Sequence, residues 1–138
     1  MPSLTTIQKF FRRAKDASLC SDFSRQKIGA VLVYGGKIIA KGCNSSKTFP
    51  MQKTYNKERD YDQNVKNNGA IHAEMMLLQK TRYLDIDWSK ASVYIYREHG
   101  KTHKPLLAKP CPACQKALID RGISQVYFST NEIPYDKL

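Results

Sequence analysis

The sequence lacks long apolar runs. None of its 138 residues belongs to an apolar stretch near the roughly 20 residues of a membrane-spanning helix, and the longest runs are IGAVLVY and MMLL. The N-terminal stretch has no apolar segment followed by a small-residue cleavage site, so we expect no secretory signal, no membrane association and a cytoplasmic location. No repeat or low-complexity segment interrupts it, which predicts one domain over residues 1–138.

Cysteines are few, and a cytoplasmic location excludes a disulfide framework. Of the four cysteines, Cys20 and Cys43 stand alone and are expected to be semi-buried thiols. Cys111 and Cys114 have C-x-x-C spacing, and no second such pair is present to complete a four-cysteine metal site. In a reducing compartment this spacing is more often metal-binding or catalytic than disulfide-forming.

Acidic residues are scarce, with 12 Asp and Glu against 23 Lys and Arg, which gives a net charge of +11. Such an excess predicts an anionic partner, either nucleotide phosphate or nucleic acid. The cations are spread along the whole chain, so an ordinary solvated surface remains the alternative.

Apolar periodicity predicts an α/β fold. Helices are expected over residues 4–20, 69–81 and 110–120, and strands over 27–34, 37–44, 91–98 and 125–130. Gly-Gly at residues 35–36 predicts a hairpin, and the later alternation of strands and helices indicates a partly parallel sheet. The polar stretch 44–69 has no clear period and is expected to be a long functional loop, while residues 131–138 have no predicted element.

The stretch GAIHAEMMLLQ is apolar almost all round, as in an interior helix, yet it contains His72 and Glu74. A buried carboxylate is costly unless it is paired, protonated or near a metal. By themselves, the two residues are more typical of a satisfied polar pair at a helix start.

Cys111 and Cys114 open the next predicted helix, in KPCPACQKAL. A helix N-terminus favours thiolate and neutral imidazole, which are the forms that bind a metal. If the two helix starts lie side by side, His72 joins both cysteines and leaves a fourth position open, as in a catalytic zinc site. Side chains at i and i+2, such as His72 and Glu74, diverge on a regular helix. In the first turn, Glu74 can still reach the water at that position.

Other interpretations stay open on the residues alone. The two cysteines could be a redox pair. His99, His103 or Cys43 could close the fourth position and make the metal structural, or the histidines could form a second zinc site.

His72-Ala73-Glu74, followed by Cys111-Pro112-Ala113-Cys114 with Pro110 before it, resembles the zinc-dependent cytidine/deoxycytidylate deaminase superfamily over roughly residues 5–130. Histidine as the first ligand is more similar to the deoxycytidylate and tRNA-adenosine branch than to the free-cytidine branch. The resemblance implies a three-layer α/β/α fold with a mixed sheet of four to five strands. It also implies an active site at two helix N-termini with one catalytic Zn²⁺ held by His72, Cys111 and Cys114.

The resemblance further implies hydrolytic deamination of cytosine or adenine, with Glu74 as the catalytic group that transfers protons. Asn44 aligns with the asparagine that binds the substrate sugar, and the Ala73 backbone with a contact to the base edge. Many relatives pack their zinc-bearing helices across subunits, which implies a homo-oligomer.

Two substrate classes compete. The basic loop 97–109 favours single-stranded DNA or tRNA, because binding several phosphates requires many cations. A free nucleotide is favoured by the long stretch 44–69, in which Lys53, Lys57 and Arg59 could close over a phosphate. The further helix and strand of the tRNA-adenosine branch have no counterpart here, so we expect a sheet one strand short and deoxycytidylate as substrate.

A third interpretation is a catalytically inactive nucleic-acid-binding domain, against which the intact Glu74 argues. Phe49, Tyr55 and Tyr96 could stack on a base, although aromatics in such positions are more often packing residues.

Overall fold

The computed structural model describes residues 2–63, 69–132 and 135–138. Its elements are α1 (Leu4–Ser18), β1 (Gln26–Tyr34), β2 (Lys37–Cys43), α2 (Pro50–Glu58), α3 (Ala73–Lys80), a 3-10 turn (Trp88–Lys90), β3 (Ser92–His99), β4 (Pro105–Leu106), α4 (Pro112–Arg121), β5 (Gln125–Phe128) and β6 (Asp136–Lys137). Within these ranges, every helix is too short or too polar to cross a membrane.

The strands form one mixed sheet in the order β2-β1-β3-β5-β6, with β4 also paired to β3. β1 runs antiparallel to β2 and β3, whereas β3 and β5 are parallel. Gly35 and Gly36 form the β1–β2 turn at φ of 60° and 77°, a region that glycine enters without strain. The predicted hairpin and partly parallel sheet are confirmed.

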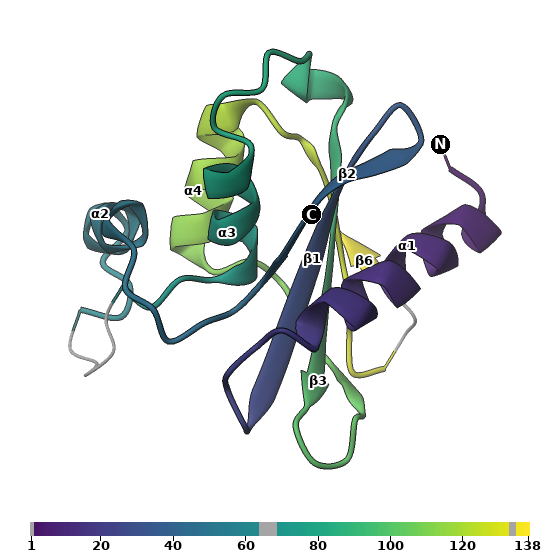
Figure 1. Ribbon diagram of the computed structural model, residues 1–138, viewed down its shortest axis with the longest axis horizontal. Coiled ribbons are helices and arrows are strands. Elements are labelled where there is room, and N and C mark those ends of the chain that lie inside the picture. The colour runs from purple at the N-terminus through teal and green to yellow at the C-terminus, as the bar shows by residue number, and fades with distance from the viewer. Residues whose placement is uncertain (1, 64–68, 133–134) are drawn as a thin grey trace.

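Helices cover both faces of the sheet (Figure 1). α1 crosses one face, α3 and α4 cover the other, and α2 lies on the outer side of α3 and α4. Alternation along β3 divides its side chains between the layers: Val93 and Ile95 face α3 and α4, while Tyr94 and Tyr96 pack on the α1 side. The three-layer α/β/α prediction is confirmed.

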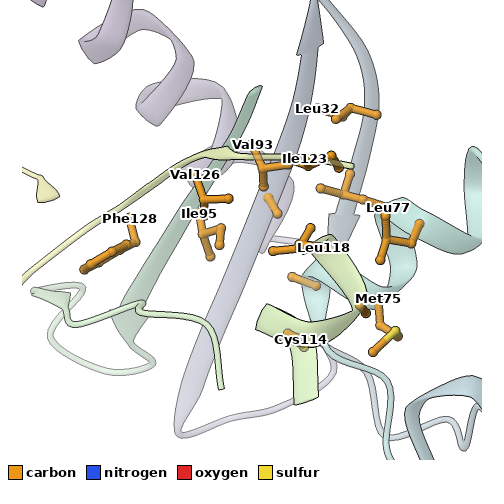
Figure 2. Close-up of a cluster of buried hydrophobic side chains, with 14 of the residues drawn as sticks. Leu32, Met75, Leu77, Val93, Ile95, Cys114, Leu118, Ile123, Val126 and Phe128 are labelled. Atoms are coloured by element: carbon orange, nitrogen blue, oxygen red, sulfur yellow. The ribbon is translucent and has the colours of Figure 1, made fainter. Parts of the chain in front are cut away.

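An apolar core holds α3 and α4 against the sheet (Figure 2). Met75 and Leu77 of α3 and Leu118 of α4 meet Val93 and Ile95 of β3, and each is at most 1% exposed. Full burial of one such side chain stabilises the fold by about 1.5–3 kcal/mol. This packing fixes the N-terminal ends of both helices, where the sequence motifs lie.

The polar stretch 44–69 is not a loop throughout, because it contains α2. Gln52 and Asn56 are buried, and Tyr55 packs at the edge of the core. A helix whose buried face is polar has no apolar period, so the sequence pattern missed it. Residues 64–68 of this stretch lie outside the described residues.

The predicted tail without structure contains β6, which pairs antiparallel with β5 through Phe128 and Asp136. The expectation of a sheet one strand short was therefore wrong, and the sheet of the described residues has six strands where four to five were expected. Like β4, β6 has two residues, too few to show an alternating pattern.

Cys20 and Cys43 are not free thiols as expected, because they form a disulfide between the end of α1 and the end of β2. Closing a loop of 23 residues stabilises the fold by about 3 kcal/mol in the chain-entropy view. Neither cysteine belongs to a motif, so only the packing of α1 on the sheet brings them together. Cys111 and Cys114 are free.

Candidate metal centre and active site

His72 is the N-cap residue of α3 and has an extended backbone, with φ −84° and ψ 159°. Its carbonyl oxygen accepts the Met76 N–H at 3.0 Å, and its own N–H donates to Gln52 Oε1 at 3.1 Å. Because His72 precedes the helix, the divergence expected for i and i+2 side chains does not arise. His72 and Glu74 line the same cavity.

The chain that leads into His72 is tied to the end of β2. Ser45 N–H donates to the Ile71 carbonyl at 3.0 Å, and Ile71 N–H donates to the Lys47 carbonyl at 2.9 Å. Gly42 lets β2 approach α3 closely, since a Cβ there would lie 2.7 Å from the Ala73 carbonyl oxygen. These contacts set the position of the α3 start.

Cys111 is the N-cap residue of α4, and Cys114 lies in the first turn of that helix. His72 Nδ1 is 3.5 Å from Cys111 Sγ and 3.3 Å from Cys114 Sγ, and the three atoms lie within 4.8 Å of one another. In a tetrahedral site with Zn–S of about 2.3 Å and Zn–N of about 2.0 Å, the N···S separation is about 3.5 Å. His72, Cys111 and Cys114, called here the metal centre, therefore have the spacing and donor chemistry of a zinc site.

The residues considered for a fourth ligand are engaged elsewhere. Cys43 is in the disulfide, His103 Nδ1 lies 3.2 Å from Glu98 Oε1, and His99 Nδ1 accepts the Lys101 N–H at 3.1 Å. In the part of the chain that the structure describes, the metal centre is the only group of three or more His, Cys, Asp or Glu placed to hold an ion. A closed structural site and a second site are thus not formed by these residues.

The two thiols and the imidazole of the metal centre form one hydrogen-bonded group. The hydrogen bond from Cys114 holds the pKa of Cys111 well below its ordinary value, and His72 acts in the same direction. As the donor of that bond, and because it is buried, Cys114 has a raised pKa. Burial lowers the pKa of His72, but the hydrogen bond and charge of Cys111 outweigh it and the net direction is upward. Zinc requires both thiolates and a neutral imidazole, so binding releases protons.

Glu74, in the first turn of α3, is 5% exposed and lines the cavity beside the metal centre. Burial raises the pKa of its carboxyl group, and the nearby His72 acts in the opposite direction. A carboxyl group with a raised pKa can exchange a proton closer to neutral pH, as general acid–base chemistry requires.

A cavity of about 410 Å³ opens in front of the metal centre. This volume is typical of small-molecule sites. Besides Glu74, His72 and Cys111, its lining includes Phe23, Gln26, Asn44, Tyr61, Asp62, Arg97 and Lys109. The cavity thus combines two aromatic rings, two cations, two amides and the Asp62 carboxylate with the candidate catalytic group.

Asn44 lies at the cavity edge, but its amide already bridges β2 to β1. Oδ1 accepts the Ile28 N–H at 3.0 Å and Nδ2 donates to the Gln26 carbonyl at 3.2 Å. One N–H and one lone pair remain for a ligand. The Ala73 side chain is fully buried in the core, so its backbone alone could meet a base. Both substrate contacts stay predictions.

The sequence motifs missed Gln52 and Tyr61. Gln52 is completely buried against His72, and the Tyr61 ring lies edge-on to the His72 ring with centroids 6.1 Å apart. Both come from the stretch 44–69, where no motif marks them.

Conversely, the cavity lining does not include the three cations of that stretch that were expected to close over a phosphate, Lys53, Lys57 and Arg59. The three candidate stacking aromatics, Phe49, Tyr55 and Tyr96, are also packing residues.

This α/β/α fold, with a His/Cys/Cys metal centre at two helix starts, defines a zinc-binding domain of the deaminase type. The family model for the cytidine and deoxycytidylate deaminase zinc-binding region matches residues 4–130. The chain belongs to this family, and zinc is its cofactor.

Solved structures share the fold. The dCMP deaminase of cyanophage S-TIM5, in its apo form, is 24% identical with a TM-score of 0.64, over 94% of this chain and 86% of that one. The same enzyme in complex with dCMP and dUMP is 21% identical with a TM-score of 0.61, over 93% of this chain and 83% of that one. A cytidine deaminase from Burkholderia pseudomallei is 20% identical with a TM-score of 0.64, over 95% of this chain and 90% of that one. No curated protein sequence matched the chain.

Proposed function

We propose that the protein is a hydrolytic deaminase that converts deoxycytidylate to its uracil form and releases ammonia. The two cations of the cavity, rather than its net charge, which Asp62 and Glu74 lower, carry the choice of substrate. Among the described residues that line it, the lysine and arginine side chains are Lys109 and Arg97. One phosphate bears about −1.5 to −2 charges at neutral pH, which two cations can balance. The shared fold with a dCMP deaminase bound to dCMP and dUMP supports this substrate.

In this proposal, His72, Cys111 and Cys114 hold the zinc ion, which when bound acts as a Lewis acid and activates water. Glu74 takes the proton from the attacking water and delivers it to the ring nitrogen beside the reacting carbon. The same carboxyl group then takes the proton of the new hydroxyl group on the reacting carbon and transfers it to the amine, so that the carbon–nitrogen bond breaks, the carbonyl forms and ammonia leaves. Burial of Glu74 supports this role, because it raises the proton affinity of the carboxylate.

Arg97 is the proposed phosphate-binding residue. Alternation along β3 places Ile95 and Arg97 toward the cavity, and Arg97 Nη1 donates to the Leu107 carbonyl at 3.1 Å, which orients the guanidinium group. Its Nε is buried and has no hydrogen-bond partner among the described residues. Asn44 would then contact the sugar and the Ala73 backbone the base edge.

Side-by-side assays of base conversion test the function. Deoxycytidylate should be converted faster than cytidine, single-stranded DNA or tRNA, because the cavity has cations for one phosphate. Turnover of DNA or tRNA without turnover of the mononucleotide would contradict the substrate but not the reaction. A zinc-loaded protein that converts none of the four would contradict the reaction and favour the inactive nucleic-acid-binding alternative.

Arg97→Met should lower kcat/KM for deoxycytidylate by about 10–100-fold, because a hydrogen bond to a charged group contributes about 1.5–3 kcal/mol. Turnover of cytidine, which has no phosphate, should not change. Lys101→Met is the matched control, since this exposed cation does not line the cavity. Equal losses on both substrates would show that Arg97 does not act on the phosphate.

A second candidate function is deamination of a polynucleotide. A neighbouring hollow lined by Arg25, His99 and Lys101 shares Gln26 with the cavity, so a basic surface continues outward from the candidate active site. Such a surface suits a phosphate chain, and binding there would be strongly salt-dependent.

The proposal has four further parts. The protein belongs to the deoxycytidylate branch and forms a single domain over residues 1–138. It assembles as a homo-oligomer and is located in the cytoplasm. Exposed apolar side chains near the ends of α3 and α4, Tyr83, Leu84 and Ile119, support an oligomer. The Cys20–Cys43 disulfide is an observation against the cytoplasmic location, since such bonds are rare there.

A further inference from the structure

We propose that Gln52 of α2 is a positioning residue of the zinc centre, which holds the ligand His72 in the geometry that the metal requires. The inference rests on the zinc-dependent function proposed above. It gives a role to α2, the helix that the sequence pattern did not reveal.

The contact of Gln52 with His72 fixes the backbone of a metal ligand. Gln52 is 0% exposed, and its Oε1 accepts the His72 N–H at 3.1 Å. On the other side of the same residue, the His72 carbonyl accepts the Met76 N–H at 3.0 Å. With both peptide groups held, the Cα–Cβ bond of His72 has one direction, and its Nδ1 lies 3.5 Å and 3.3 Å from the sulfurs of Cys111 and Cys114.

The Gln52 amide is itself held in one orientation. Its Nε2 donates to Asn56 Oδ1 at 2.8 Å, one turn further along α2. Asn56 is also buried, at 1% exposure. One amide is therefore fixed by its own helix while it holds the ligand at the start of α3.

Helix α2 is in turn attached to α4. Tyr55 O–H donates to Asp120 Oδ2 at 2.7 Å, and α2 lies beside α4 (Figure 1). Hydrogen-bonding partners of metal ligands typically change metal affinity by about 10–100-fold when they are lost. A residue that only fills space would not have this effect.

The test compares variants of the whole protein for zinc affinity, measured by competition with a chelator, and for the visible spectrum of the Co²⁺-substituted form. Gln52→Met keeps the length of the side chain but cannot hydrogen-bond, so the zinc Kd should rise about 10–100-fold and the Co²⁺ bands should change. Gln52→Glu keeps an oxygen facing the His72 N–H. Its Co²⁺ spectrum should therefore be closer to that of the unchanged protein than the spectrum of Gln52→Met is. Tyr55→Phe, which loses the bond to Asp120 but leaves Gln52 in place, should keep zinc affinity within about twofold.

Thermal unfolding without metal shows whether each variant folds, and Gln52→Ala gives the same comparison if Gln52→Met does not fold. Unchanged affinity and spectrum in the variant that lacks the amide would overturn the proposal. So would equal losses in Tyr55→Phe, because they would assign the effect to α2 as a whole. If the unchanged protein binds no zinc, the proposed function fails as well, which separates that outcome from failure of the Gln52 role alone.

Discussion

Glu74→Gln is expected to keep zinc and the fold and to lower kcat for deoxycytidylate by a factor of about 10²–10⁴. Glutamine has the same shape but cannot take a proton from water or deliver it to the base. Burial already disfavours the charged carboxylate at this position, so a neutral amide should cost little stability. The measurements are kcat, zinc content and thermal unfolding of the same preparation.

Glu58→Gln is the matched control, because Glu58 is exposed on α2 and does not line the cavity. It should have the activity of the unchanged protein. Full activity of Glu74→Gln would contradict the proposed proton transfer. Loss of zinc from that variant would instead show that the carboxylate is a ligand.

Cys111→Ser should abolish stoichiometric zinc binding and, with it, deamination. The unchanged protein should carry about one equivalent of zinc, because the metal centre offers three ligands at zinc spacing. Serine is chosen because Cys111 Sγ accepts the Cys114 N–H as an N-cap, a role that a serine hydroxyl keeps and alanine would lose. The loss of the thiolate is thereby separated from damage to α4.

A ligand that binds the native state at a concentration 1,000 times its Kd stabilises that state by about 4 kcal/mol. A chelator should therefore lower the Tm of the unchanged protein and leave that of Cys111→Ser almost unaffected. Cys20→Ser is the control: it removes the disulfide and lowers stability, yet it should retain zinc. Equal zinc content in Cys111→Ser and the unchanged protein would rule out the proposed metal centre.

Local patterns were sufficient for most of the fold. α1, the hairpin with its turn at Gly35 and Gly36, β3, β5 and α4 all follow from apolar periodicity and turn chemistry. Gly122 ends α4 in the left-handed conformation, as expected for a C-cap glycine. These signals are readable because each element buries an apolar face whose period is written in neighbouring residues.

Elements without such a face were not predictable. α2 buries the amides Gln52 and Asn56, and β4 and β6 are too short for a pattern. The same limit applies to the cavity: Lys53, Lys57 and Arg59 have the charge for phosphate, but the fold places Arg97 and Lys109 there instead. Charge can be counted from a sequence, whereas the direction of a side chain depends on the strand or helix that carries it.

The sequence by itself determined the α/β class, the two motif-bearing helix starts and the identity of the three metal-binding groups with their acidic neighbour. Spacing and chemical type are local properties, so the chain order preserves them. Only the tertiary structure decided that His72 meets Cys111 and Cys114, that Cys20 bonds to Cys43, and that a buried glutamine fixes the histidine. Each of these contacts joins segments 20 or more residues apart, and packing of the helices on the sheet, not any neighbouring residue, brings them within bonding distance.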